Sequence, residues 1–369
     1  IFGGGLSRDI EGVVRNTIEA ANRARAVRVA VDIPSGIHGD TGQALGTHFR
    51  ADLSVTFFRK KPGHLLFPGR SACGEVNVAD IGIPESTLME IAPQIAENTP
   101  ALWRHSFPVP TAIDHKYRRG HALVVSGAVG STGAARLAAR AALRIGCGLV
   151  TVASPPDALP VNAAQLTTVM TESFEDQEGF ERILAARRRN AVLLGPGNGV
   201  TDATRARVLT ALRDDAACVL DADALTVFEG RGAELFGSIN GWCIMTPHDG
   251  EFTRLFGESP AEQGKVSTAK DAARECGAVV LLKGADTVIA APDGRVSINS
   301  NAPPDLASAG TGDVLSGLVV GLLAQGMEPF DAACAACWVH GASGALVGPG
   351  LIAEDLPEAI PPILRQLRR

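Results

Sequence analysis

The chain has 369 residues, of which 46% are hydrophobic, 20% charged and 5% aromatic. This length exceeds what one hydrophobic core usually supports, so we expect two domains, and the composition is typical of a well-packed α/β protein. The net charge of −6 comes from interspersed acids and bases, without the basic stripe that follows a nucleic-acid backbone. These features argue against a disordered chain and against a nucleic-acid partner.

No uninterrupted apolar run reaches the roughly 18 residues that span a bilayer, and no signal peptide opens the chain. The seven cysteines are scattered and give no disulfide or metal-binding pattern. We therefore expect a cytoplasmic protein without a membrane segment. The chain starts at Ile1 and its first methionine is Met89, so we expect the numbering to begin inside a longer natural chain.

The first part of the chain alternates β-rich and helical stretches, with strands predicted at residues 27–32, 51–58 and 75–81. A proline-rich segment without periodicity follows and is typical of a linker. We expect a first α/β domain over residues 1–92, a linker over 93–110, and a second domain over 111–369.

The second domain repeats the alternation of strands and helices on a larger scale. Strands are predicted at residues 121–126, 149–153, 191–194, 218–221, 242–246 and 279–283. Such repetition requires right-handed crossovers and a mostly parallel sheet with helices on both faces. Ligands in these sheets lie beyond the carboxyl ends of the strands.

Glycine-rich and polar segments follow these predicted strands. Residues 126–134 carry a glycine at every third position before a helix predicted at 135–145, so backbone amides there can approach a ligand closely. Further polar segments occupy residues 195–198, 221–225 and 246–251. Each segment alone is explained about as well by a tight turn or a helix N-cap without a ligand.

The most informative segment runs from Ala309 to Asp313, directly before an apolar helix predicted at 314–325. A helix start offers unpaired amides and a positive dipole end, which suit an anionic phosphate. A carboxylate on the same turn would repel phosphate, so Asp313 indicates a base that accepts a proton from an attacking hydroxyl. The simpler alternative is that Asp313 only complements the helix dipole.

From His115 to about Leu356 the chain resembles the ADP/ATP-dependent NAD(P)H-hydrate dehydratases, which have the ribokinase-like fold. The matching motifs follow one another in order over the whole second domain, at residues 115–116, 127–134, 195–197, 221–225, 246–248, 282–285 and 310–315. The resemblance implies that ADP or ATP phosphorylates the hydroxyl of a hydrated nicotinamide ring, and that phosphate then leaves to regenerate NAD(P)H. Mg²⁺ is implied as the charge partner of the phosphates.

The same resemblance implies roles for individual residues, with Asp313 as the catalytic base. The nucleotide would be bound by Lys283, Gly284, Ala285, Asp286, Thr287, Gly310, Thr311 and Gly312. The hydrate would be bound by Ala134, Gly197, His248 and Asp313. Two departures from the family pattern, Asp249 in place of the usual Pro and Ala307-Ser308-Ala309 in place of a glycine-richer run, remove no reactive group.

The first domain resembles the C-terminal part of the NAD(P)H-hydrate epimerases. Motifs at residues 3–8, 31–36 and 61–63 carry this resemblance. It implies that Asp32 is an acid/base and that Ser35 helps to bind K⁺. Hydrate contacts are implied for Gly3, Gly4, Gly5, Leu6, Ser7, Arg8 and Asp32. Residues 33–36 could equally form only a turn after a strand.

The family's nucleotide loop and a K⁺-binding Asp would lie upstream of Ile1. We therefore expect that the chain as given cannot interconvert the R and S hydrates and that the longer protein can. The substrates implied are NADHX and NADPHX with ADP or ATP, and we expect a homo-oligomer. Two alternatives stay open: a small-molecule kinase on the same fold, which would release a stable phosphate ester, and a non-catalytic nucleotide sensor or scaffold.

Overall fold

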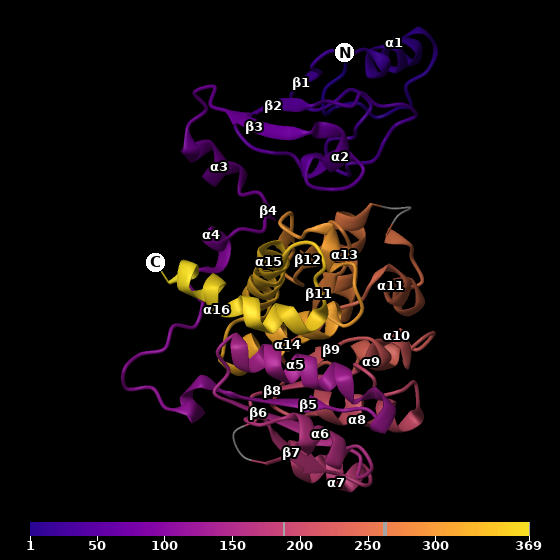
Figure 1. The fold of residues 1–369 in the computed structure, drawn as a ribbon. Coiled ribbons are helices and arrows are strands. Elements are labelled where there is room, and N and C mark those ends of the chain that lie inside the picture. Colours follow the sequence, from indigo (N-terminus) through magenta and orange to yellow (C-terminus); the bar gives the residue numbers. More distant parts are fainter. Residues whose placement is uncertain (187–188, 261–263, 369) are drawn as a thin grey trace. The chain divides into compact units, whose positions relative to one another are not determined.

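The computed structural model describes residues 1–186, 189–260 and 264–368. Contacts divide the chain into a smaller unit that contains Ile1–Glu97 and a larger unit made of most of the remaining chain. Each unit is built on its own sheet (Figure 1).

The smaller unit contains a parallel sheet in the order β1-β2-β3. Its strands are shorter than predicted, and a small core of Ile33, Ile37, Ala72 and Cys73 packs beside them. The elements are α1 (Gly12–Arg23), β1 (Val29–Val31), β2 (Leu53–Phe57), η1 (Pro62–His64), α2 (Gly69–Cys73), β3 (Glu75–Ala79), α3 (Glu85–Ile91) and β4 (Ile95–Glu97).

The larger unit alternates strands and helices for most of its length. Its first elements are α4 (Pro100–Trp103), η2 (Lys116–Arg119), β5 (His121–Val125), η3 (Val129–Ser131), α5 (Thr132–Arg144), β6 (Leu149–Ser154), α6 (Leu159–Gln165), β7 (Met170–Ser173), α7 (Gln177–Leu184), β8 (Ala191–Leu194) and α8 (Asp202–Arg213). The middle elements are β9 (Ala217–Leu220), α9 (Asp223–Thr226), α10 (Gly232–Phe236), β10 (Cys243–Met245), α11 (Asp249–Phe256), α13 (Lys265–Cys276) and β11 (Val279–Leu282). The last are β12 (Val288–Ala290), β13 (Val296–Ile298), η4 (Pro304–Leu306), α14 (Thr311–Ala324), α15 (Pro329–Val347), η5 (Ala353–Asp355) and α16 (Leu356–Leu367).

The strands of this sheet follow the order β13-β12-β11-β10-β9-β8-β5-β6-β7. Those from β11 to β7 pair in parallel, whereas β12 and β13 form an antiparallel extension. From β5 the chain first builds the sheet toward β7 and then returns to build it in the opposite direction from β8. The strand order therefore reverses between β5 and β8, the point at which parallel sheets open a ligand crevice.

Helices cover both faces of the sheet, as predicted for a ribokinase-like fold. Helix α14 contacts β5, β8 and β9, and α15 contacts β10, β11 and β12. Figure 1 shows α5 and α14 on one side of the sheet, with α7 and α8 on the other. Helix α14 is apolar all round and almost wholly buried, so its position is fixed by packing on every side. The fold prediction is confirmed.

Some features differ from the expectations. The segment predicted as a linker, residues 93–110, contains β4 and α4, and the Trp103 side chain is fully buried in the core of the larger unit. Strands β4, β7, β12 and β13 were not predicted. Strand β7 contains a single apolar residue, Met170, and so has no apolar run that would mark it. Within the described residues, α15 alone has the length and hydropathy of a membrane span, and 72% of its apolar window is buried inside the fold.

Candidate active site

The start of α14 is shaped by a glycine in a left-handed conformation. Gly310, the N-cap residue, has φ 85° and offers no side chain to the first-turn amides. A Cβ atom there would lie 2.9 Å from Leu137 Cδ1 on α5 and 3.0 Å from Ala353 Cβ. Any other residue would be strained and crowded at this position. The helix start therefore keeps bare amides of the kind that bind anions.

Two side chains hold the backbone that leads into α14. The Thr311 hydroxyl lies 2.9 Å from the carbonyl oxygens of Leu306 and Ser308, to either of which it can donate. His340 on α15 donates from Nε2 to the Thr311 carbonyl at 2.9 Å. Burial lowers the pKa of His340 to about 4, so the imidazole is neutral near pH 7 and carries its proton on Nε2, which donates to this carbonyl. The first turn of α14 is thus held by the local bonds of Thr311 and by His340, which lies 29 positions further along the chain.

A buried ion pair joins the carboxyl ends of two strands beneath this helix start. Lys283 follows β11 and Asp221 follows β9, and Lys283 Nζ donates to Asp221 Oδ1 at 2.7 Å. The Asp221 side chain is 3% exposed. Its other oxygen accepts from the Ser316 hydroxyl of α14 at 2.5 Å. A Cβ atom at Gly312 would lie 3.9 Å from Lys283 Nζ, which places the ammonium beside the first turn of α14.

Asp313 lies on that same first turn and shares the electrostatic field of the pair. Burial and the negative charge of Asp221 raise the pKa of Asp313 to about 6, although Lys283 acts in the opposite direction. Burial alone would lower the pKa of Lys283, but Asp221, Glu251 and Asp313 outweigh it, so the pKa is raised and the ammonium stays charged. A carboxylate with a pKa near 6 can accept and release a proton close to neutrality.

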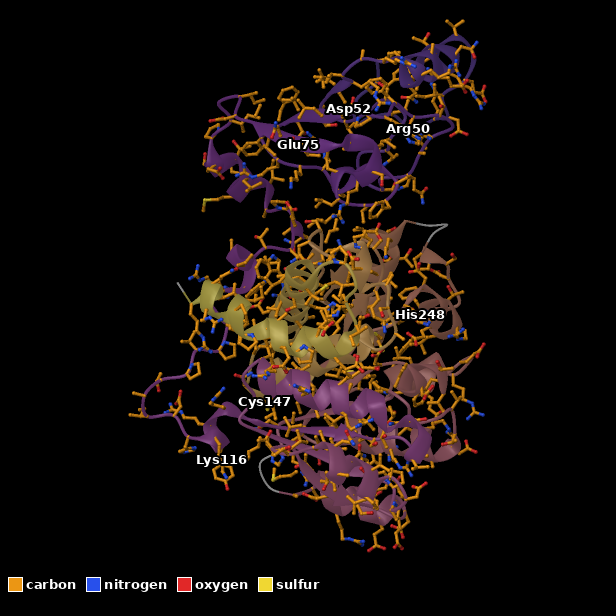
Figure 2. All side chains as sticks on the ribbon, in the orientation of Figure 1. Arg50, Asp52, Glu75, Lys116, Cys147 and His248 are labelled. Carbon is orange, nitrogen blue, oxygen red and sulfur yellow. The ribbon has the colours of Figure 1, made fainter. Side chains whose placement is uncertain are left out.

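The start of α11 adds a further carboxylate to this cluster. Glu251 is buried, and its Oε2 accepts from the His248 amide at 2.9 Å and lies 3.9 Å from Lys283 Nζ. His248 Nδ1 in turn accepts from the amides of Gly250 and Glu251, so a neutral His248 carries its proton on Nε2. The His248 side chain is exposed at the surface of the larger unit (Figure 2).

The loops after β5 and β8 are in direct backbone contact at the reversal of the strand order. A Cβ atom at Gly127 would lie only 1.7 Å from the carbonyl oxygen of Gly197. Asn198 ties the two loops together, because its side-chain amide donates to the Val125 carbonyl at 2.9 Å and its oxygen accepts from the Gly195 amide at 2.9 Å. The predicted hydrate-binding Gly197 is thus held at the crevice position of the sheet.

Replacing Gly127 with Ala is expected to lower the free energy of unfolding by about 1–3 kcal/mol, because the added methyl group meets backbone atoms that cannot turn aside. Gly133→Ala is the matched control, because no atom lies within 4 Å of a Cβ at that position and Ala favours the helix. Thermal or urea denaturation measures the free energy of unfolding of both variants. Equal stability of the two variants would contradict the close contact between the loops.

The predicted nucleotide-binding segment, residues 283–287, forms the turn between β11 and the antiparallel β12. The Thr287 hydroxyl donates to the Gly284 carbonyl at 2.9 Å, and the side chains of Asp286 and Thr287 are buried. Gly284 and Ala285 are exposed. The turn is therefore preorganised and leaves accessible backbone beside Lys283.

A second polar cluster surrounds Asp32 in the smaller unit. Asp32 has φ 68°, and its Oδ1 accepts from Lys61 Nζ and from the Thr56 hydroxyl, the latter at 2.8 Å. Burial would raise the pKa of Asp32, but these hydrogen bonds outweigh it and hold the pKa below its usual range. His64 Nε2 lies 2.8 Å from the Asp32 carbonyl oxygen. Asp32 is thus an ionised carboxylate in a left-handed, tightly held conformation.

The predicted residues of the smaller unit are brought together only in part. A Cβ atom at Gly4 would lie 3.9 Å from Asp32 Oδ2, so this part of the 3–8 segment borders the carboxylate. Gly3, Gly5, Ser7 and Arg8 are exposed, whereas Leu6 is buried beside Ile10 and Ile18. The Ser35 hydroxyl accepts from the Phe2 amide at 2.9 Å and can donate to the Phe2 carbonyl at 3.1 Å. Ser35 therefore orders the same segment.

In the larger unit the structure places Lys283, Gly312 and Asp313 together. His248 is linked to this group through Glu251, which accepts a hydrogen bond from the His248 amide and lies near Lys283. Ala134 lies on the first turns of α5, the helix whose Leu137 borders Gly310. Sequence reasoning placed Asp221 and Glu251 in polar segments after strands but gave neither a role of its own, and it missed Ser316. Their signals were a polar residue directly after a strand, a helix-capping Glu, and one hydroxyl in an otherwise apolar helix.

Both units of the chain are similar to known proteins. The family model described as NAD(P)H-hydrate dehydratase matches residues 122–361, and the model described as YjeF-related protein N-terminus matches residues 1–63. The bifunctional NAD(P)H-hydrate repair enzyme Nnr of Salinibacter ruber is 39% identical over 98% of this chain and 70% of that protein. The enzyme of the same name from Moorella thermoacetica is 38% identical over 100% of this chain and 72% of that protein.

Solved structures are similar in fold to the larger unit. The ADP/ATP-dependent NAD(P)H-hydrate dehydratase of Bacillus subtilis, co-crystallised with ATP and Mg²⁺, has a TM-score of 0.65 and 29% identity, covering 73% of this chain and 98% of that one. A ribokinase-like superfamily protein of Enterococcus faecalis has a TM-score of 0.66 at 20% identity, covering 74% and 96%, and supports the fold alone. The chain belongs to the family of bifunctional NAD(P)H-hydrate repair enzymes.

Proposed function

We propose that the larger unit dehydrates the S form of NAD(P)H hydrate in a reaction driven by ADP or ATP, with Asp313 as the base. The observation that carries this proposal is the position of Asp313. It is a carboxylate with a pKa of about 6, on the first turn of a helix whose N-cap glycine leaves the amides bare, beside the Lys283 ammonium.

In the proposed mechanism the ring hydroxyl of the hydrate attacks the terminal phosphorus of the nucleotide. The hydroxyl proton passes to Asp313, and the bond from phosphorus to the bridging oxygen breaks, which releases AMP from ADP or ADP from ATP. The amides of Gly310 to Gly312 and the Lys283 ammonium stabilise the charge on the transferred phosphoryl group. The phosphorylated hydrate then loses phosphate and a ring proton, which restores the double bond of NAD(P)H.

The remaining assignments follow the resemblance, and the geometry supports several of them. The turn at residues 283–287 and the bare amides at 310–312 suit the nucleotide. Gly197 lies at the crevice of the sheet, and Ala134 and His248 lie on the neighbouring helix starts. These placements support hydrate binding across the carboxyl ends of the strands.

The described residues contain no group of three or more His, Cys, Asp or Glu that could hold a metal ion. Mg²⁺ commonly binds through one or two carboxylates together with substrate phosphates. We therefore assign Mg²⁺ to the phosphates of the nucleotide, where it would offset their charge, and propose no residue of this chain as its ligand.

For the smaller unit we propose that Asp32 serves as an acid/base in epimerisation of the hydrate by the full-length protein. Its ionised state and its contact with Lys61 support this role. The Ser35 hydroxyl is already bonded to the Phe2 backbone, so the residues present do not by themselves form a K⁺ site. K⁺ binding at Ser35, the homo-oligomeric state and the cytoplasmic location stay predictions. Light scattering tests the predicted homo-oligomeric state.

The decisive experiment incubates S-hydrate with Mg²⁺ and either ADP or ATP and follows NAD(P)H by its absorbance. The expected result is a rise in absorbance with release of one free phosphate per NAD(P)H. A small-molecule kinase would instead release a stable phosphate ester, and a nucleotide sensor would bind ADP without turnover. Either of these results would overturn the proposal.

The rate is expected to fall on the acid side with a midpoint near pH 6. Asp313 accepts a proton only when ionised, so the rate is lost as the pH drops through its pKa of about 6 and is maintained above it. The measurement is the pH profile of kcat/KM for the hydrate at saturating nucleotide. Nucleotide affinity measured over the same range is the control, because terminal phosphates also titrate at about pH 6. A flat profile from pH 5 to 8 would contradict the role of Asp313.

A further inference from the structure

Asp221 is held by more contacts than a simple ion pair requires. Its carboxylate accepts hydrogen bonds from Lys283 at 2.7 Å, from Ser316 at 2.5 Å and from the Ala222 amide at 2.9 Å. These donors come from three separate elements: the end of β11, helix α14 and the turn after β9. Ala222 itself has φ 48°, a conformation that costs free energy for a residue with a Cβ and is retained mainly at functional sites.

The backbone of Asp221 is fixed as well. Its amide donates to the Leu194 carbonyl at 3.2 Å, and its own carbonyl accepts from Ala224 at 3.0 Å. A Cβ atom at Gly195 would lie 1.7 Å from the same carbonyl oxygen, so the loop after β8 packs directly on this residue. The backbone of Asp221 is therefore held in place by two hydrogen bonds and by the loop after β8.

The sheet explains why a pair of this kind is needed at this place. Strand β10 lies between β9 and β11, so the ends of β9 and β11 are about 10 Å apart at the usual strand spacing. The long Lys283 side chain crosses this gap to reach Asp221 and thereby brings its ammonium beneath the start of α14. The Ser316 contact ties α14 to the same carboxylate one turn after Gly312 and Asp313.

We propose that Asp221 is a positioning residue of the dehydratase reaction: it holds the Lys283 ammonium beside the α14 amides, anchors the helix through Ser316, and contributes a negative charge to the surroundings of Asp313. This inference rests on the proposed function. Asp221 acts through Lys283 and Asp313, and its full set of hydrogen bonds leaves it no need to contact the substrate.

A merely structural ion pair is the competing explanation. Buried pairs often add little net stability over apolar residues of the same shape, so stability alone does not explain this one. The two explanations differ in one measurable respect. A charge that keeps Asp313 basic moves the pH profile when it is removed, whereas a purely structural pair changes the amount of folded protein and leaves the midpoint in place.

Several charged or titratable groups lie on the elements packed around the start of α14. They are Asp221, Lys283, Glu251, His340, Arg136, Glu354 and Asp355. The first two affect the pKa of Asp313 directly, Asp221 upward and Lys283 downward. His340 is neutral and contacts the Thr311 backbone.

The first variant is Asp221→Asn, which keeps the shape and most of the hydrogen bonds but removes the charge. The acid midpoint of kcat/KM is expected to fall by about one pH unit, since a like charge near Asp313 is lost. The maximal kcat is expected to fall about 10- to 100-fold, because Lys283 is no longer held by a charged partner. Asp215→Asn is the matched control: it removes the same charge from an exposed residue at the opposite end of β9 and is expected to change neither value.

The second variant, Ser316→Ala, keeps the charge and removes one anchor, so kcat is expected to fall about tenfold with the midpoint unchanged. It also keeps the inference testable if Asp221→Asn does not fold, as judged by circular dichroism. An unchanged midpoint in folded Asp221→Asn, or an unchanged kcat in Ser316→Ala, would overturn the inference. These results differ from a failure of the proposed function, in which the unsubstituted protein itself would show no turnover of the hydrate.

Discussion

Asp313→Asn is expected to lower kcat for hydrate dehydration by about 10²- to 10⁴-fold, the usual contribution of a positioned general base. The amide has nearly the shape of the carboxylate but cannot accept the hydroxyl proton. Nucleotide affinity is expected to stay the same or to rise above pH 6, because the substituted side chain no longer repels phosphate at the start of α14. Absorbance assays give the first quantity and titration calorimetry with ADP gives the second.

The control for this variant is Asp202→Asn, which removes another first-turn carboxylate. Asp202 begins α8, and its side chain is 90% exposed. If Asp313 served only the helix dipole, the two variants would have similar small effects on stability and none on turnover. Full activity of Asp313→Asn would refute the base role, whereas loss of ADP binding would show that the carboxylate instead maintains the nucleotide site.

Lys283→Met is expected to destabilise the protein by about 3 kcal/mol near pH 7.5 and to abolish measurable turnover. The substitution removes the cation that pairs with Asp221 and lies close to Glu251, and both carboxylates are buried. Removing one partner of a buried pair leaves an uncompensated charge, which is the costly case. Met keeps much of the apolar stem of the lysine side chain, so the loss of stability reflects the missing charge more than lost packing.

The pH dependence of this loss provides its check. Without Lys283 the remaining carboxylates gain protons more readily, so the stability difference from the unsubstituted protein is expected to shrink as the pH falls from 8 toward 5. Denaturation curves of both proteins at several pH values measure this difference in stability. Lys116→Met, at an exposed lysine in η2, is the control and is expected to change stability by less than about 0.5 kcal/mol. A loss independent of pH would point to packing instead of charge.

The start of α14 was predictable because its signals are local. Two glycines, an acid and a long apolar run indicate a helix start with bare amides, and the helix begins at Thr311 with Asp313 on its first turn. The central parallel strands were predictable for the same reason, since each is an apolar run bounded by polar turns. The ends of these strands differ from the predictions by at most one residue, which is within the usual uncertainty of such boundaries.

The segment at residues 93–110 shows where local signals mislead. Its prolines and lack of periodicity are typical of a linker, yet Trp103 is fully buried and donates from Nε1 to Asn98 Oδ1 at 3.0 Å. Asn98 in turn donates to Asn299 Oδ1 at 2.9 Å, a residue 201 positions away. Contacts of this range leave no periodic trace in the sequence.

The sequence by itself determined the α/β fold class and the role of Asp313, because helix starts and strand ends are marked by neighbouring residues, and the order of its motifs carried the family resemblance that implied Lys283. Only the tertiary structure decided that Asp221 pairs with Lys283, that Ser316 anchors to it, and that the pKa of Asp313 rises to about 6. These properties depend on strand order and burial, which bring together residues 62 and 95 positions apart. A polar residue after a strand looks the same in sequence whether it caps a turn or holds the charge balance of an active site.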